Sequence, residues 1–456
     1  MFLFCLLAIF FLNINPILAS DRNIFGLHLT QTADINSAQQ IINSSNGDWG
    51  YATLVIRTDQ LDKSTWQDFF DNCRKYHIIP IIRLATSMEN NYWKIPQEKD
   101  IDILAEFLNS LNWPIIPQYI IPFNEINHAA EWGSAIDIQK FTDIAIYTAN
   151  KFKDLNPNFF ILSTPLDLAA ANNLPDTKSA SSVYQEIYNY NPQYFQLIDG
   201  LASHSYPNHG YIGTPNDSGQ HSIRGYLWEL DFIKKLGVDK KYSVFITETG
   251  WPHREGVKKN NQFYSVKTSA DFLIKALEIW QKDEQVIAVT PFIYNYPQAP
   301  FDHFSWLDSQ EKLFPEYQSI IDLPKGQNHP QQINKFEILK INLPLLIFSQ
   351  RDQGGSIDLK NIGQSIWGET NFCLEAQTSS NITSTPLCTD NSPVTPGKTT
   401  RIPFQFKINS YQEKSYLGWS DTPQYEISSL SPTSTIYQPK DNLWRRFKSW
   451  LKVFLS

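Results

Sequence analysis

Residues 119–125 read YIIPFNE, and residues 243–248 read SVFITE. In both stretches an apolar run, typical of a strand buried on both faces, leads directly into a glutamate, Glu125 or Glu248. An unpaired carboxylate is costly inside a core, and neither glutamate has the setting of a solvated helix face. The two stretches therefore predict strands that each end in an acidic side chain.

Six further apolar runs of strand length accompany these two. The eight predicted strands are Ile24–Leu29, Thr53–Arg57, Ile78–Leu84, Tyr119–Phe123, Phe159–Ser163, Gly200–His204, Ser243–Thr247 and Val286–Tyr294. Amphipathic helical patterns separate them. Eight β/α units between residues 21 and 324 suit a closed (β/α)8 barrel, the TIM barrel, better than an open doubly wound sheet. A Gly-x-Gly-x-x-Gly motif does not follow the first strand, which disfavours a dinucleotide-binding fold.

Two of the helical stretches carry recognisable signals. Residues 64–67 (STWQ) predict a capping box at the start of the helix after the second strand. In the helix after the seventh strand, Phe272, Ile274, Ala276 and Ile279 are expected to form the face that packs on the strands.

A second domain is predicted after the eighth strand. Residues 324–330 (PKGQNHP) are rich in helix breakers, so we expect a linker over residues 325–335. Beyond the linker the helical periodicity ends, and an all-β sandwich is predicted over residues 336–437. Its strands are expected at 338–348, 356–360, 371–376, 400–408 and 416–419.

The predicted sandwich carries short motifs. Residues 358–367 (DLKNIGQSIW), followed by PG at 396–397 and FQF at 404–406, resemble an immunoglobulin-like domain common in exported bacterial proteins. The resemblance covers about a fifth of the chain and implies spacing or adhesion rather than chemistry.

Both ends of the chain have signatures of their own. Residues 1–20 contain an apolar run too short to cross a bilayer comfortably and then the small residues Ala19 and Ser20, so we expect a secretory signal peptide. An uncleaved membrane anchor is the alternative, and either makes the remainder a secreted or cell-surface protein. Residues 441–456 predict a basic amphipathic helix, which either contacts a membrane interface peripherally or docks on the protein's own surface.

The four cysteines have different settings. Cys5 lies in the expected signal, and Cys73 lies in a helical pattern where a small buried hydrophobe is expected. Cys373 and Cys388 flank a Ser/Thr-rich stretch that resembles a hairpin loop, and they are placed to form a disulfide. No pair has the spacing of zinc ligands, so we expect no metal.

Composition excludes one class of partner. The net charge is −8, whereas a nucleic-acid-binding protein needs a basic surface to neutralise phosphates. Aromatic residues make up 14% of the chain. Aromatic side chains can form the flat surfaces on which sugar rings stack, so this content is compatible with an oligo- or polysaccharide substrate.

The two strand-end glutamates suggest a reaction. In a barrel, residues just past the strand ends form the active-site mouth, and Glu125 and Glu248 would follow the fourth and seventh strands, across the mouth from each other. Cleaving a glycosidic bond with retention requires two carboxyl groups about 5–5.5 Å apart. We expect Glu125 to be the protonated acid/base and Glu248 to be the ionised nucleophile.

At these residues the chain resembles a known group of enzymes. Asn124-Glu125 after strand four and Glu248 after strand seven resemble clan A of the glycoside hydrolases, which are retaining (β/α)8 enzymes. The string from Thr247 to Pro252 (TETGWP) is similar to the nucleophile region of members that act on β-1,3-glucans.

The resemblance implies further roles. Asn124 would donate a hydrogen bond to the sugar 2-hydroxyl, and Arg57, at the end of strand two, would support the nucleophile or form a salt bridge in the barrel mouth. At the end of strand six, Tyr206 would donate to the nucleophile and His204 would lie nearby. His28, at the end of strand one, is a weaker candidate for sugar binding.

The sequence departs from the clan after strand eight. The clan commonly has a tryptophan there as a floor for the sugar, whereas this chain has Tyr294 and Tyr296 as the candidate platforms. Trp93, Trp132 and Trp251 follow strands three, four and seven, where each either lines the site or packs its own loop.

The leading hypothesis is therefore a retaining β-glycoside hydrolase that works by double displacement without a cofactor. A non-catalytic carbohydrate-binding surface protein is the alternative from another class, although binding alone does not need the carboxyl pair. A transglycosylase that remodels cell-envelope glycans would use the same residues as the hydrolase.

Overall fold

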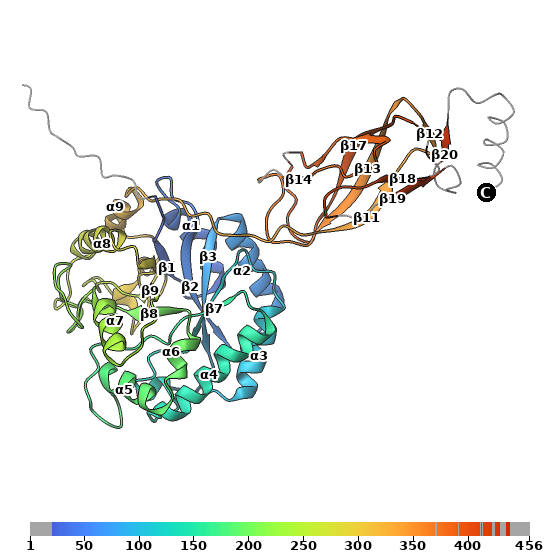
Figure 1. Ribbon diagram of the computed structural model, residues 1–456. Helices are drawn as coiled ribbons and strands as arrows, with labels where there is room; N and C mark the ends of the chain where they lie inside the picture. The colour runs from blue at the N-terminus through green and yellow to red at the C-terminus, as the bar shows by residue number, and fades with distance from the viewer. Residues whose placement is uncertain are drawn as a thin grey trace, which may run out of the picture. The chain divides into compact units, whose positions relative to one another are not determined.

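The computed structural model describes residues 21–369, 372–390, 392–410, 412, 414–421, 425–428 and 435–437. They divide into two compact units (Figure 1). Unit 1 contains residues 21–111 and 117–330, and unit 2 contains residues 112–116 together with residues from 331 onward. The expected signal peptide over 1–20 and the expected amphipathic helix over 441–456 lie outside the described residues.

The described part of unit 1 contains eight parallel strands in two sheets. The five-stranded sheet has the order β1 (Gly26–His28), β2 (Gly50–Arg57), β3 (Ile78–Ala85), β6 (Gln118–Pro122) and β7 (Phe159–Ile161). The three-stranded sheet consists of β8 (Gly200–His204), β9 (Ser243–Glu248) and β10 (Val286–Val289). Single parallel bridges connect Leu162 with Gly200 and Phe25 with Val289, at the edges of the two sheets.

All eight strands predicted for this region are present. They could be predicted because a parallel strand that is buried on both faces is a continuous apolar run in the sequence. The eighth is shorter than predicted. It ends at Val289, and Pro291 beyond it has no N–H to donate to a neighbouring strand. An unpredicted hairpin, β4 (Met88–Glu89) and β5 (Tyr92–Trp93), follows β3.

Helices lie around the outside of these strands (Figure 1). They are α1 (Ile35–Ile42), α2 (Lys63–Lys75), α3 (Glu98–Asn109), α4 (Ile138–Leu155), α5 (Ala180–Tyr190), α6 (Gln193–Leu197), α7 (Gly225–Lys235), α8 (Val266–Gln281) and α9 (Gln318–Ile321). None of the helices among the described residues is both long enough and apolar enough to span a membrane.

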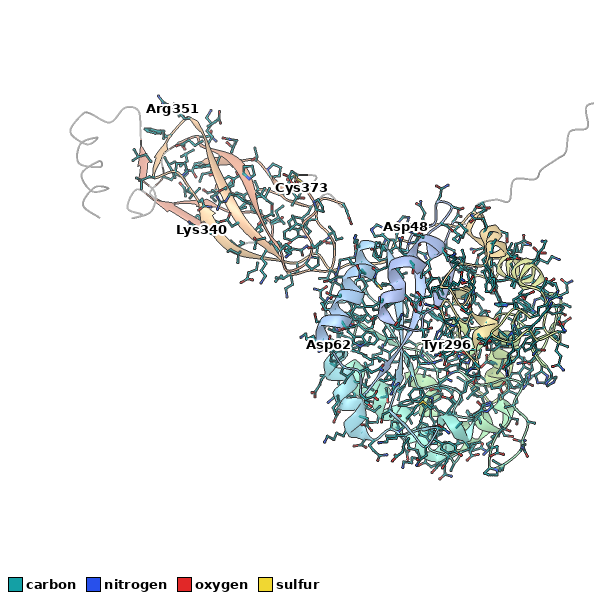
Figure 2. All side chains as sticks on the ribbon, turned by 180° about the vertical axis from the view of Figure 1, so that it is seen from behind. Asp48, Asp62, Tyr296, Lys340, Arg351 and Cys373 are labelled. Atoms are coloured by element: carbon teal, nitrogen blue, oxygen red, sulfur yellow. A yellow bond between two sulfur atoms is a disulfide. The ribbon has the colours of Figure 1, made fainter. Side chains whose placement is uncertain are left out.

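Two helix details differ from the prediction. Helix α2 is capped by Asp62, which is labelled in Figure 2. Its carboxylate accepts from the Thr65 N–H at 2.7 Å, so the capping box predicted at residues 64–67 is wrong. In α8 the buried apolar face includes Val266, Leu273 and Trp280, which follow the helical period. Of the four residues predicted for that face, Ala276 is buried, and Phe272, Ile274 and Ile279 are half-buried.

The described residues of unit 2 from 331 onward form strands. The largest sheet is antiparallel, with the order β11 (Phe336–Asn342), β13 (Asp352–Asn361), β17 (Thr399–Ile408) and β15 (Ile382–Ser384). Smaller pairs are β12 (Leu346–Phe348) with β20 (Thr435–Tyr437), β14 (Cys373–Leu374) with β16 (Leu387–Cys388), and β18 (Lys414–Leu417) with β19 (Tyr425–Ser428). The immunoglobulin-like topology remains a prediction.

A core forms under the large sheet of unit 2 because its strands alternate. Along β17, Ile402, Phe404, Phe406 and Ile408 are buried while the residues between them are more exposed. The single strand predicted over residues 338–348 is instead two strands, β11 and β12, separated by a break that contains Pro344.

The short segment at residues 112–116 is held within unit 2 by backbone acceptors. The Gln332 side chain donates to the Pro114 carbonyl at 2.8 Å, and the Gln364 side chain donates to the Ile115 carbonyl at 3.2 Å. The Ile116 N–H donates to the Gln331 carbonyl at 2.9 Å. These bonds are long-range in sequence, so no local pattern could have predicted them.

The described cysteines are one disulfide pair and one free thiol. Cys373 and Cys388 lie opposite each other on β14 and β16 and form a disulfide. Cys73 is a fully buried free thiol on α2, and burial raises the pKa of this thiol well above its ordinary value.

Replacing Cys373 and Cys388 together with serine should destabilise unit 2 by about 3 kcal/mol, because the disulfide closes a loop with a sequence separation of 15. Hydrogen–deuterium exchange of the full chain is expected to accelerate in β13 and β17 and to stay unchanged in the strands of unit 1. Equal exchange in β17 with and without the disulfide would contradict this expectation.

Candidate active site

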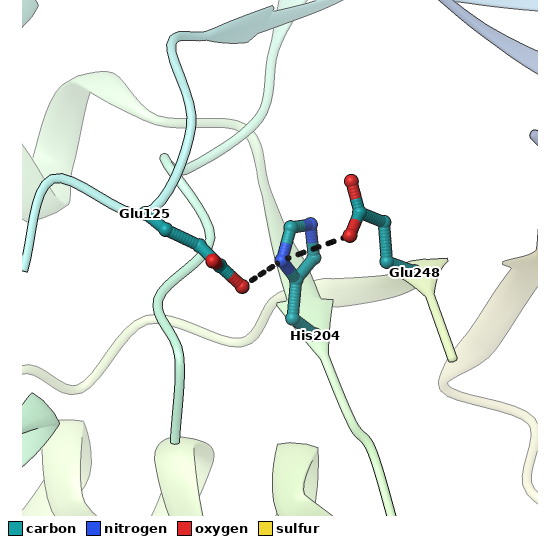
Figure 3. Close-up of side chains that lie close together, drawn as sticks. All are labelled: Glu125, His204 and Glu248. Atoms are coloured by element: carbon teal, nitrogen blue, oxygen red, sulfur yellow. Dashed lines mark hydrogen bonds and ion pairs between the residues drawn. The ribbon is translucent and has the colours of Figure 1, made fainter. Parts of the chain in front are cut away.

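Three strand ends of unit 1 bring Glu125, His204 and Glu248 together, and the two glutamates line one pocket, whereas His204 is buried behind it. Glu248 is the last residue of β9, His204 is the last residue of β8, and Glu125 lies three residues past β6. Both carboxyl groups point toward the His204 ring (Figure 3). The His204 Nδ1 atom lies 2.6 Å from Glu125 Oε1 and 3.7 Å from Glu248 Oε2. One oxygen of each carboxyl group and the ring nitrogen all lie within 4.8 Å of one another.

The backbone around Glu125 has an uncommon conformation. Phe123 has a φ of 66° and Glu125 has a φ of 24°, in the left-handed region that side chains with a Cβ rarely adopt. Such residues concentrate at functional sites, where the surrounding structure holds them in place. Here the turn carries the Glu125 side chain from the end of β6 toward β8.

The pocket has a volume of about 250 Å³ and is lined by both glutamates. Its polar lining also includes Asn124, Tyr206 and Arg83. The aromatic part of its wall consists of Trp93, Phe123, Trp132, Tyr211, Phe292, Phe301 and Phe304. A concave site with an apolar wall and a few convergent polar groups is typical of small-molecule and sugar sites.

Glu248 is held in its ionised form. The Arg83 Nη1 atom donates to its Oε1 at 2.5 Å, and the Tyr206 hydroxyl donates to its Oε2 at 3.2 Å. Burial alone would raise the pKa of Glu248, but the positive charges of His204 and Arg83 outweigh burial and lower the pKa to about 2. The residue predicted as the nucleophile is therefore a carboxylate at neutral pH.

The two histidines of the site differ in charge. Burial lowers the pKa of His204, yet the charge of Glu248 and the hydrogen bond to Glu125 outweigh burial and leave this pKa above its ordinary value. His28 lies 3.6 Å from Glu248 Oε1, measured from Nε2, and burial lowers the pKa of His28 to about 3. His28 is thus neutral at neutral pH, and its ring packs edge-on against Phe292, with the ring centroids 5.2 Å apart.

The arginine at Glu248 comes from a different strand than predicted. The Arg57 guanidinium forms a salt bridge with Asp59 at 2.6 Å, in line with the alternative expected for it, and lies over the Trp93 ring. Arg83 and not Arg57 contacts Glu248. In the register of β2 and β3, Val55 pairs with Arg83, which places Arg57 two residues further along. The sequence signal that could have identified Arg83 is its place inside an apolar strand, because a charge there needs a partner of opposite charge.

Asn124 lies where the sequence predicts it. Its Oδ1 atom accepts from Arg83 Nη1 at 2.7 Å, so the same guanidinium nitrogen donates to Asn124 and to Glu248. This contact fixes the amide orientation and leaves the Asn124 NH₂ group as a donor. The donor role toward a sugar hydroxyl remains a prediction.

A third carboxyl group in the pocket was missed. Glu131 ends the short 3-10 helix Ala129–Glu131 after β6, lines the pocket, and accepts a hydrogen bond from Asn124. Burial, reinforced by the charge of Glu125, raises the pKa of Glu131 to about 7. No strand-end pattern marks this residue, because it reaches the pocket from a loop.

Two aromatic residues predicted to contact substrate lie elsewhere. Trp251 is buried against Phe272, and its indole N–H donates to the Gly213 carbonyl at 2.7 Å. Tyr294 is buried, and its hydroxyl interacts with Ser37. Neither side chain is among the described residues that line the pocket, and the aromatic wall beyond β10 is formed by Phe292, Phe301 and Phe304 instead.

Glu125, His204 and Glu248 are also a donor set that a metal ion could use. However, Glu248 Oε1 already accepts from the Arg83 cation, and His204 Nδ1 is hydrogen-bonded to Glu125. A metal ion would have to compete with that fixed positive charge. The arrangement therefore favours proton transfer and nucleophilic chemistry over metal binding.

No known protein family matches the chain, and no curated protein matches it. Solved structures with similar folds include a GH128 endo-β-1,3-glucanase from Pseudomonas viridiflava (13% identity, 67% of this chain, 99% of that chain, TM-score 0.43). A second is a glucosidase from Croceicoccus marinus, with 7% identity over 86% of this chain and 97% of that chain and a TM-score of 0.48. A third is an active-site mutant of a β-1,3-glucanosyltransferase from Rhizomucor miehei in complex with laminaritriose, with 13% identity over 66% of this chain and 98% of that chain and a TM-score of 0.42. These are distant likenesses in fold.

Arg83→Met should raise the pKa of Glu248, because the nearest positive charge is lost while the carboxylate stays buried. NMR titration of ¹³C-labelled glutamate carboxyl groups would measure the shift. Arg57→Met is the matched control and should leave the titration of Glu248 unchanged, since Arg57 pairs with Asp59. An unmoved midpoint in the Arg83 variant would contradict the assignment.

Proposed function

We propose that the chain is a glycoside hydrolase that cleaves β-linked glycans with retention of anomeric configuration. The observation that carries the proposal is the approach of Glu125 and Glu248, whose nearest oxygens lie within 4.8 Å across one pocket. Retaining enzymes hold their carboxyl groups about 5–5.5 Å apart, whereas inverting enzymes leave roughly 6.5–9.5 Å for a water molecule.

In the first step, the ionised Glu248 attacks the anomeric carbon, and the bond from this carbon to the leaving oxygen breaks. Glu125 donates a proton to that oxygen. In the second step, water attacks the same carbon, Glu125 takes its proton, and the glycosyl–Glu248 bond breaks. Proton and charge balance across the two steps, and no cofactor is needed.

The surrounding residues support these roles. Arg83 and Tyr206 each donate to one oxygen of Glu248, which orients the carboxylate and stabilises it as the leaving group of the second step. His204 is hydrogen-bonded to Glu125 at 2.6 Å, and this contact orients the carboxyl group that we propose as the proton donor. A protein that only binds sugar would not need this arrangement, which favours catalysis over a purely binding role.

Unit 1 is, in this proposal, a closed (β/α)8 barrel. The strands within each of its two sheets are parallel, and single parallel bridges connect the sheets at both edges. The candidate site lies at the carboxyl ends of these strands, as in barrel enzymes. We assign unit 2 as an immunoglobulin-like sandwich that acts as a spacer or adhesion module. Its disulfide fits a secreted or cell-surface location, because disulfides persist in oxidising compartments.

Glu125→Gln and Glu248→Gln should each lower kcat/KM by at least about 10³-fold on whichever substrate is cleaved, because each removes a group that acts in the transition state. A panel of β-glucans, mannans, xylans and aryl β-glycosides would identify that substrate. Glu316→Gln, at an exposed position, is the control and should retain full activity. Turnover near that of the wild type in either pocket variant would end the assignment.

The stereochemical outcome is a separate expectation. NMR of the first product should show the β-anomer before mutarotation, and a 2-fluoro glycoside should form a covalent adduct on Glu248 that mass spectrometry locates. Initial release of the α-anomer would indicate inversion and contradict double displacement, even if both glutamates proved essential.

A further inference from the structure

A second hollow adjoins the candidate active site. It has a volume of about 520 Å³, and it shares Trp93 and Lys94 with the first pocket. Its other lining side chains include Tyr92 from the hairpin β4–β5, Gln97 before α3, and Ser134 and Lys140 near the start of α4. Trp93 and Lys94 therefore form a wall that the two hollows share.

The shared wall is held firmly. The Gly133 N–H donates to the Trp93 carbonyl at 2.8 Å, and the Thr86 hydroxyl donates to the Lys94 carbonyl at 2.6 Å. Gly133 has a φ of 64°, and a Cβ at this position would lie 2.4 Å from the Ile95 side chain. Only glycine allows the loop to approach the hairpin this closely, so the position of Trp93 between the two hollows is fixed.

The hairpin is an addition to the barrel pattern, since a βα connection needs only a few residues. Ordering a longer loop costs conformational entropy, and loops at this end of a parallel sheet commonly carry binding residues. Tyr92 at the hairpin is 39% exposed even though it is a large aromatic side chain. The hairpin thus presents an aromatic surface to solvent next to the candidate active site.

The side chains that line the second hollow are complementary to a sugar ring. A pyranose ring has apolar C–H faces and hydroxyl groups around its edge. Trp93 and Tyr92 offer aromatic surface for the faces, while Gln97, Ser134 and Lys140 offer hydrogen-bonding groups for the edge. This combination of an aromatic wall and a few polar groups is the same as in the first pocket.

We propose that the second hollow is a further sugar-binding subsite, so that a linear β-linked glycan extends from the Glu125–Glu248 pair past Trp93 onto the hairpin. The inference rests on the proposed function and deepens it. The substrate class is then an oligo- or polysaccharide that occupies both hollows, and glycosides of a single sugar are poor substrates.

The test compares substrate length. Short and long linear oligosaccharides of β-1,3-glucan, β-1,4-glucan, mannan and xylan would be assayed with the full chain. In the cleaved series, kcat/KM should be higher for the long members, and Tyr92→Ala should lower the long-to-short ratio about fivefold, as expected for the loss of one aromatic contact. Tyr190→Ala is the matched control, because Tyr190 is 42% exposed and lies on α5.

A binding measurement separates the two proposals. Glu248→Gln should bind the long oligosaccharide in calorimetry without cleaving it, and adding Tyr92→Ala should weaken this binding about fivefold. Cleavage with equal kcat/KM for all lengths, or a Tyr92 variant that matches the Tyr190 control in both measurements, would overturn the subsite and leave the proposed function standing. Failure to cleave any of these series and any aryl β-glycoside would refute the proposed function itself, and unaltered binding by the Tyr92 variant would then refute the subsite.

Discussion

A buried carboxylate such as Glu248 stays ionised beside a second carboxyl group only if positive charge is placed against it. Arg83 and His204 supply that charge here. One guanidinium nitrogen donates to both Asn124 and Glu248, and one imidazole nitrogen lies between Glu125 and Glu248. The ends of β3, β6, β8 and β9 are thus joined by hydrogen bonds, and the geometry of the pocket follows from the register of these strands.

The fold of unit 1 was predictable because its information is local. A parallel strand covered on both faces must be apolar along its length, and each such run in the sequence became a strand. The glutamate pair was predictable for the same reason, since each residue follows directly from a run of this kind. The place of residues 112–116 in unit 2 could not be predicted, because it depends on hydrogen-bond partners more than 200 positions away in the sequence.

The errors in the site arise where side-chain direction matters. Arg57 and Arg83 both lie near the carboxyl ends of adjacent strands, and only the register reveals which one reaches Glu248. Trp251 lies three residues after Glu248 in sequence, yet its ring turns away to pack on α8. Glu131 arrives from a loop. Sequence position locates a strand end, whereas long-range packing decides where each nearby side chain points.

The backbone at Glu125 links the chemistry of the pocket to the stability of the fold. A side chain held at a φ of 24° is strained, and such strain costs of order 1–3 kcal/mol. Glycine at this position would relieve the strain, and it would also remove the carboxyl group that we propose as the acid/base. Selection for thermostability alone would therefore tend to replace Glu125, whatever this residue contributes to the pocket.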